Sequence, residues 1–165
     1  MESRIYILSK TIRSGKTTQL LHWAKINDAQ LSGILTPDVN GIRMIYDLSA
    51  KQYFPFQVPE DVVCEDSQQI GRFTFYQSAF NQANHIIERA FLEDPDWLVI
   101  DEVGPLELLN KGFDTVLKTI IPAYLSGKQK GNLLLVIRES LLVETCHFYN
   151  IHTYQSFDLS KKQRL

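Results

Sequence analysis

The sequence lacks most of the features that mark secreted, membrane-spanning and nucleic-acid-binding proteins. It has only two cysteines, Cys64 and Cys146, which form no Cys-x-x-Cys pair, so two reduced thiols are expected rather than a disulfide framework. No apolar run approaches the roughly 20 residues that span a bilayer, and residues 1–8 lack the basic segment and long apolar core of a signal peptide. The formal net charge of −2 leaves no basic surplus for general binding to nucleic acid. We therefore expect a cytoplasmic protein for which neither a membrane nor a nucleic acid is the partner.

The composition is that of an ordinary globular protein. Hydrophobic residues make up 44% of the chain and charged residues 22%, which is close to the average for soluble domains. A chain of 165 residues is long enough to bury a proper core and short enough to form one domain. We expect residues 1–165 to fold as a single domain.

One stretch near the amino terminus has the arrangement of a phosphate-binding loop (P-loop). An apolar run at residues 5–8 predicts a buried strand, Gly-Lys-Thr-Thr follows at residues 15–18, and an amphipathic segment begins at Gln19. Backbone N–H groups of such a loop and of the first helical turn point at phosphate oxygens, and the helix dipole favours the negative charge. Lys16 is then expected to reach the terminal phosphates, and the Thr17 hydroxyl to bind Mg²⁺. The predicted phosphate-binding residues are Lys10, Thr11, Ile12, Arg13, Ser14, Gly15, Lys16, Thr17 and Thr18.

The loop departs from the usual pattern of Gly, four residues and Gly-Lys-Ser/Thr. The position expected to hold the first glycine is occupied by Lys10. Where a turn needs backbone angles that a Cβ disfavours, a residue other than glycine costs about 1–3 kcal/mol. If this cost falls entirely on ligand binding, the affinity decreases by about one to two decades. Lys10 and Arg13 also add positive charge beside the phosphates. Arg13 would act as a built-in arginine finger or would occlude the terminal phosphate, and the sequence leaves both open.

A second stretch supplies the carboxylates that such a loop needs. The apolar run at residues 97–100 ends on Asp101 and Glu102 and predicts a central parallel strand. In a P-loop fold such a strand ends in an aspartate beside Mg²⁺, and the adjacent acidic residue can orient or deprotonate an attacking water. We therefore expect Asp101 to bind the metal together with Thr17, and Glu102 to be the general base.

The rest of the chain alternates between helical and strand-like patterns. Helices are predicted at residues 17–27, 78–92, 113–125 and 140–148, with Pro122 kinking or breaking the third. Strands are predicted at residues 5–8, 33–36, 97–101, 133–137 and 151–157. Further β-rich runs at residues 42–48 and 52–58 predict a hairpin, and residues 62–64 and 70–76 predict two more strands. The expected fold is a mostly parallel α/β sheet flanked by helices, with an inserted antiparallel β block around residues 42–76.

The run Val-Ile-Asp-Glu-Val-Gly-Pro-Leu-Glu-Leu at residues 99–108 resembles the signature of a family of small P-loop nucleoside-triphosphatases. This thermophile NTPase family has the cancer-related nucleoside-triphosphatases as its vertebrate members. Three further stretches match the family's order: residues 33–48, residues 71–80, and residues 134–138, which end in Arg138. The resemblance covers about residues 4–140.

The resemblance implies a P-loop NTPase-like domain that hydrolyses ATP, GTP or other nucleoside triphosphates to diphosphate and phosphate with Mg²⁺. It places Lys16 and Thr17 at the phosphates and metal, and Asp101 and Glu102 as the catalytic carboxylates. Members of the family carry Gly-x-x-Gly-x-Gly-Lys-Thr, of which the first two glycines are replaced here. Slow or lost turnover is therefore the expected consequence if the altered loop binds nucleotide poorly.

Other charged residues are candidates for the same site. Arg138 follows a predicted central strand, at the edge where open α/β sheets bind ligands, and could neutralise charge on the terminal phosphate. Arg43 and Arg72, in the inserted block, would cover the nucleotide or lie on a solvated strand face. Glu107 would face the cleft or serve as a carboxylate at the start of a helix. The predicted catalytic residues are Glu102, Lys16 and Arg138.

Three functions fit these residues, and hydrolysis of a nucleoside triphosphate is favoured because Lys16, Thr17, Asp101 and Glu102 are all present. A small-molecule kinase would use the block at residues 42–76 as its acceptor site. A nucleotide-binding module with weak or lost catalysis, which works through a protein partner, would explain the altered loop.

Overall fold

A mixed β-sheet forms the centre of the protein, of which a computed structural model describes residues 4–11, 15–26 and 30–160. The sheet has the strand order β10–β1–β9–β8–β2–β4–β3, β5 also pairs with β4, and β6 and β7 form a separate two-stranded sheet. The strands are β1 (Ile5–Lys10), β2 (Leu31–Leu35), β3 (Asp38–Val39), β4 (Ile42–Asp47), β5 (Gln52–Pro55), β6 (Ser67–Ile70), β7 (Phe73–Tyr76), β8 (Trp97–Val103), β9 (Asn132–Arg138) and β10 (Gln155–Ser156). The helices are α1 (Lys16–Ile26), α2 (Gln77–Leu92), α3 (Pro105–Leu108), α4 (Asp114–Leu125) and α5 (Leu142–Phe148), with a 3₁₀ turn, η1, at Glu139–Leu141.

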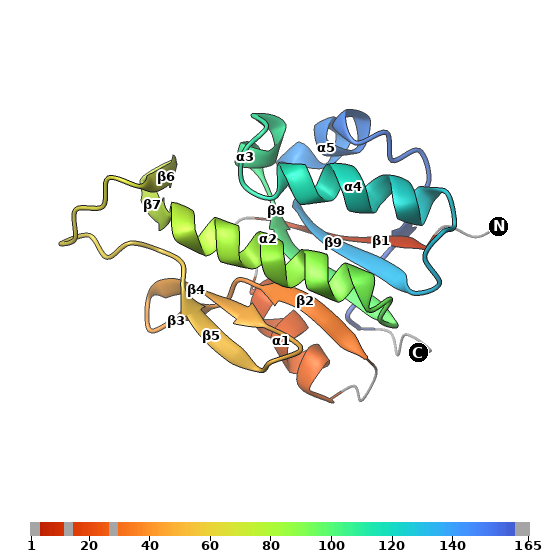
Figure 1. Cartoon of the computed structure of the whole chain (residues 1–165), viewed down its shortest axis with the longest axis horizontal. Helices are drawn as coiled ribbons and strands as arrows, with labels where there is room; N and C mark the ends of the chain where they lie inside the picture. Colours follow the sequence, from red (N-terminus) through yellow and green to blue (C-terminus); the bar gives the residue numbers. More distant parts are fainter. Residues whose placement is uncertain (1–3, 12–14, 27–29, 161–165) are drawn as a thin grey trace.

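The strands from β10 to β2 run parallel, and helices cover both faces of the sheet. Alternate residues of β8 face opposite sides: Leu98 and Ile100 join the core beneath α2 and α4, whereas Trp97 and Val99 join the core beneath α1. Figure 1 shows α2 and α4 on one face and α1 on the other. The predicted α/β class with a mostly parallel sheet is thus confirmed. Within the described residues, no helix is both long and apolar enough to cross a membrane.

The inserted block is antiparallel, as predicted. The strand β4 runs antiparallel to β2, β3 and β5, so the hairpin expected at residues 42–48 and 52–58 is present. A bridge between Gln57 and Phe75 connects this hairpin to β7. In Figure 1, β6 and β7 lie at one end of the molecule, beside the start of α2.

Two strand predictions within the inserted β block are wrong. Residues 62–64 form no strand, and Val63 there is 94% exposed, so these residues have neither a partner strand nor a core to cover. Residues 70–76 are not one strand, because the chain reverses at Gly71 and Arg72 and joins β6 to β7 as a hairpin. Gly71 has a φ of 59°, which glycine adopts without strain. Phe73, Thr74 and Phe75 alternate between apolar and polar, and the prediction extended this short alternation back across the turn to Ile70.

Two further differences concern the second half of the chain. The helix α4 contains Pro122 but is not broken by it, and Ile120, Ile121 and Tyr124 on the same turns are buried. We infer that this packing offsets the backbone hydrogen bond that proline cannot donate. The strand expected at residues 151–157 is reduced to β10, which pairs with β1 at the edge of the sheet.

Candidate functional site

A cavity of about 650 Å³ opens where the central strands end. Residues at the start of α1, at the ends of β2, β8 and β9, and in the inserted block line it. The carboxyl ends of parallel strands share one edge of a sheet, and open α/β sheets bind ligands at that edge. Lys16, Glu102 and Arg138, which were predicted as catalytic, all line this cavity. Residues far apart in the sequence are therefore brought to one place.

One end of the cavity is formed by the turn that enters α1. Gly15 has a φ of 71°, in the left-handed region that favours glycine, and its carbonyl accepts the N–H of Gln19 at 3.1 Å. The first N–H groups of a helix have no partner within the helix, so this end of the cavity suits an anion. The lining residues here are Thr11, Gly15, Lys16, Thr17 and Thr18.

The substituted first glycine of the loop falls in a strand, not in a turn. Lys10 is the last residue of β1 and pairs in register with Arg138 of β9, so its backbone is extended. Any residue adopts this conformation, and the backbone penalty expected for a residue other than glycine therefore does not arise at Lys10. The predictions for Ile12, Arg13 and Ser14 lie outside the described residues.

Asp101 is fully buried and is held by Thr36, the residue after β2. The backbone N–H of Thr36 donates to Asp101 Oδ2 at 3.0 Å, and its hydroxyl donates to the same oxygen at 3.4 Å. Gly33 allows β2 to come this close to β8, because a Cβ at that position would lie 2.1 Å from the Val99 carbonyl oxygen. Thr36 lines the cavity, and Asp101 lies behind it. Thr36 could not be singled out from the sequence, because its role depends on the pairing of β2 with β8.

Glu102 lies between two arginines in the wall of the cavity. Its Oε1 is 3.6 Å from Arg138 Nη2, and its Oε2 is 3.8 Å from Arg43 Nη1. The Glu102 side chain is 16% exposed, whereas that of Arg43 is 38% exposed. Arg43 comes from the inserted block, and its ion pair with Glu102 follows from the register of β4, which no sequence signal showed. The cavity edge therefore carries a carboxylate with a guanidinium on each side.

Glu107 is buried and lines the cavity, and its carboxyl is hydrogen-bonded within the loop that follows β8. Its Oε2 accepts the N–H of Gly104 at 2.8 Å, and its Oε1 accepts the N–H of Phe113 at 3.0 Å. Burial raises the pKa of this carboxyl from 4.5 to about 7, against the lowering effect of the two N–H donors. The carboxyl fastens the loop between β8 and α4 around the short helix α3.

Replacing Glu107 with glutamine is expected to remove a pH dependence of stability. The unfolded chain releases this proton near pH 4.5 and the folded protein near pH 7, so the unfolding free energy falls as the pH rises between these values. From about pH 5.5 to pH 7, the wild type should lose about 2 kcal/mol relative to Glu107→Gln. Urea unfolding at several pH values measures this, with the exposed-site variant Glu93→Gln as control. If the unfolding free energies of wild type and Glu107→Gln change in parallel with pH, the buried carboxyl of Glu107 is not the source of the pH dependence.

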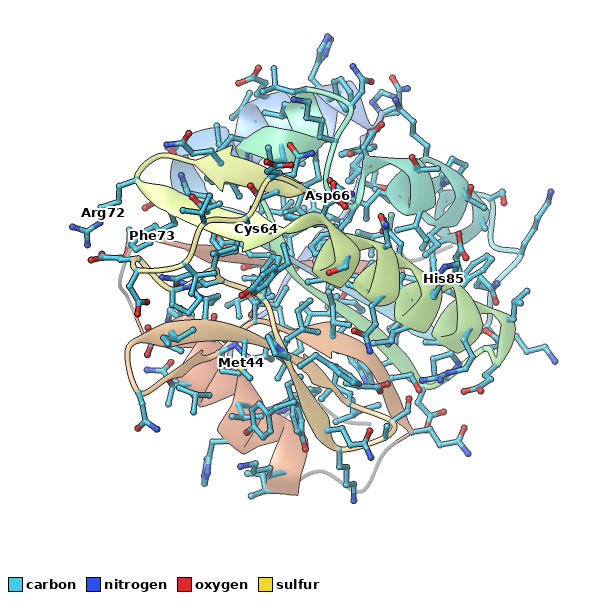
Figure 2. All side chains as sticks on the ribbon, turned by 60° about the vertical axis from the view of Figure 1, so that its left-hand side comes forward. Met44, Cys64, Asp66, Arg72, Phe73 and His85 are labelled. Carbon is cyan, nitrogen blue, oxygen red and sulfur yellow. The ribbon has the colours of Figure 1, made fainter. Side chains whose placement is uncertain are left out.

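One wall of the cavity is apolar. Phe80, Phe113 and Leu106 line it and belong to the core on the α2 and α4 face, opposite the face covered by α1. The cavity therefore crosses the edge of the sheet, from the start of α1 to an aromatic wall. At its rim, the Arg72 guanidinium lies 4.8 Å from the centre of the Phe73 ring. Figure 2 shows the Arg72 side chain pointing away from the body of the molecule.

The oxygen donors present suit a magnesium ion that arrives with a nucleotide. Among the residues that the structure describes, no three His, Cys, Asp or Glu side chains gather closely enough to hold a metal by themselves. Mg²⁺ in phosphoryl-transfer sites takes one or two protein oxygens and completes its shell with waters and phosphates. The Thr17 hydroxyl at the cavity wall and the Asp101 carboxylate behind Thr36 are hard oxygen donors of this kind.

Comparisons with known proteins agree with this fold. Residues 5–164 match the sequence pattern of the NTPase family. The fold is similar to that of THEP1 from the hyperthermophile Aquifex aeolicus, with a TM-score of 0.72 and 18% identity over 94% of this chain and 89% of that one. It is also similar to a human cancer-related nucleoside triphosphatase, with a TM-score of 0.58 and 20% identity over 98% of this chain and 90% of that one. A search of the curated proteins finds no significant match. The match over residues 5–164 shows that the chain belongs to the NTPase family, the small P-loop nucleoside-triphosphatases whose signature residues 99–108 resemble.

Proposed function

We propose that the protein hydrolyses nucleoside triphosphates to diphosphate and phosphate with Mg²⁺. The observation that supports this most strongly is that Lys16, at the start of α1, and Glu102, near the end of β8, line one cavity at the edge of the sheet. A cation for the terminal phosphates and a carboxylate for the attacking water are the two groups that this reaction needs.

The phosphate end of the site would bind and orient the substrate. Backbone N–H groups of the turn at Gly15 and of the first turn of α1 would donate to the phosphates, and the Lys16 ammonium would contact the β- and γ-phosphates. Thr17 and Asp101 would hold the metal, which when bound draws charge from the phosphate oxygens. The hydrogen bonds from Thr36 to Asp101 Oδ2 support this role, because they would hold the carboxylate in one orientation.

The carboxylate of Glu102 would act on the water. The water oxygen forms a new bond to the terminal phosphorus, its proton passes to Glu102, and the bond to the bridging oxygen breaks. The bridging oxygen keeps the electron pair and leaves on the diphosphate. Arg138, which pairs with Glu102 across 3.6 Å, would neutralise charge that builds on the phosphate oxygens.

Removal of magnesium is expected to bring phosphate release to background. Without a divalent ion, the charge of the triphosphate is not balanced and the Thr17 and Asp101 oxygens repel it. Phosphate release from ATP, GTP, CTP and UTP, measured with Mg²⁺ and with excess EDTA, tests this. Restoring Mg²⁺ after EDTA should restore the rate. Equal rates in both conditions would contradict the proposal, and nucleotide binding without any turnover would indicate a binding module instead.

A small-molecule kinase is the second candidate, and the apolar part of the cavity favours it. Hydrolysis needs room for one water beside Glu102, whereas a cavity of about 650 Å³ with an apolar wall of Phe80, Phe113 and Leu106 could also hold a larger acceptor. The two functions differ in their products. A kinase would form nucleoside diphosphate without free phosphate, and only when an acceptor is added.

A further inference from the structure

Arg43 lies where it could contact a ligand in the cavity as well as Glu102. Its guanidinium lies 3.8 Å from Glu102 Oε2, and Arg138 lies 3.6 Å from Glu102 Oε1. Both separations exceed those of hydrogen bonds, so these are ion pairs without the directional contact that makes an arginine–carboxylate pair strong. The Arg43 side chain is also 38% exposed, and water weakens such a pair further. A better acceptor could therefore replace Glu102 as the partner of Arg43.

The backbone of Arg43 is held by hydrogen bonds, whereas its partly exposed guanidinium is paired with Glu102 over 3.8 Å. The backbone N–H of Arg43 donates to Gln57 Oε1 at 3.1 Å, and its carbonyl accepts the N–H of Gln57 at 3.0 Å. On its other side, Arg43 pairs in register with Asp38 of β3. The guanidinium thus stands at the end of a flexible side chain on a held strand. It can turn within the cavity without any change in the fold.

The charges around Glu102 leave a surplus that matches an anion. The guanidinium groups of Arg43 and Arg138 both face the single carboxylate of Glu102, although the cavity as a whole is lined by four basic and four acidic side chains. A terminal phosphate offers a guanidinium two oxygens in the spacing of its N–H fork, and more negative charge than a carboxylate. When Arg43 turns to the phosphate, Glu102 Oε2 loses its ion pair with Arg43.

We propose that Arg43 is a further catalytic residue, which exchanges Glu102 for the terminal phosphate when a triphosphate binds. This inference rests on the proposed function, because it needs a triphosphate held at Lys16. Until a γ-phosphate is present, Arg43 stays paired with Glu102, and once substrate is in place Arg43 would pair with the phosphate instead. The inserted β block would thereby contribute the Arg43 guanidinium to the hydrolysis of the triphosphate.

Nucleotides with and without a terminal phosphate test this exchange. Calorimetry would compare Mg-ADP with the Mg complex of the non-hydrolysable imido analogue of ATP, on wild type, Arg43→Ala and Arg43→Lys. We expect Arg43→Ala to weaken binding of the analogue about tenfold and to leave the affinity for ADP unchanged. Its kcat should fall as well, and Arg43→Lys should recover part of both losses. Lys51→Gln, which removes a charge from the exposed turn between β4 and β5, is the matched control.

The possible outcomes distinguish a failure of this inference from a failure of the proposed hydrolase function. If Arg43→Ala binds the analogue as tightly as wild type does, or loses equal affinity for ADP and the analogue, the exchange is wrong and the hydrolase proposal stands. If wild type binds neither nucleotide, the proposed function fails and the exchange fails with it. Circular dichroism and thermal unfolding of Arg43→Ala confirm that the comparison is made on folded protein.

Discussion

Glutamine in place of Glu102 is expected to lower kcat for nucleoside triphosphate hydrolysis by about 10²- to 10⁴-fold while nucleotide binding is kept. The amide has the shape of the carboxylate but cannot take the proton of the attacking water. It also carries no charge for the guanidinium groups of Arg43 and Arg138, which lie 3.8 and 3.6 Å from the carboxylate oxygens in the wild type. Those two cations remain to attract a triphosphate, so its affinity should hold or increase.

Single-turnover phosphate release and calorimetry together measure both parts of this expectation. Glu65→Gln is a matched control, because it removes the same charge from an exposed position outside the cavity. A Glu102→Gln protein with the turnover of the wild type would show that another group activates the water. Loss of nucleotide binding in the variant would show that Glu102 holds the site together rather than acting on water.

Alanine in place of Lys16 is expected to weaken binding of a Mg-triphosphate about 10- to 100-fold. The reason is that the ammonium supplies a charge-assisted contact to the β- and γ-phosphates, and the start of α1 offers only backbone N–H groups in its place. Turnover at saturating nucleotide should fall too, because charge on the leaving diphosphate is then balanced less well.

The helix that carries Lys16 also provides its control. Lys25 lies in the last turn of α1 and is exposed, so Lys25→Ala removes one charge from the same helix at the end away from the cavity. It should change affinity little. Equal losses in Lys16→Ala and Lys25→Ala would mean that the nucleotide responds to overall charge, and that Lys16 makes no specific contact.

The parts of the fold predicted correctly are those in which burial is complete. Unbroken apolar runs at residues 97–100 and 133–137 became β8 and β9, because a strand covered on both faces must be apolar at every position. The β6–β7 hairpin was missed because β6, Ser-Gln-Gln-Ile at residues 67–70, is mostly polar and shows no strand-like alternation. The helix α3 was also missed, although Pro105 at its first position is a recognised start signal.

For the candidate site, topology explains both what was predicted and what was not. Lys16 and Glu102 line one cavity because Lys16 follows β1 and Glu102 lies near the end of β8, and these parallel strands end at one edge of the sheet. The position of Asp101 behind Thr36, and the contact of Arg43 with Glu102, depend on how β2 and β4 pair with their neighbours. Strand register of this kind follows from side-chain packing and not from any local pattern.

The most direct measurement is a crystal structure of the protein with Mg²⁺ and a non-hydrolysable triphosphate analogue. The terminal phosphate should contact Lys16 Nζ, with the Glu102 carboxylate one water molecule away on the side opposite the bridging oxygen. A nucleotide bound outside this cavity, or one whose terminal phosphate points away from Glu102, would contradict the convergence of these two residues on one substrate.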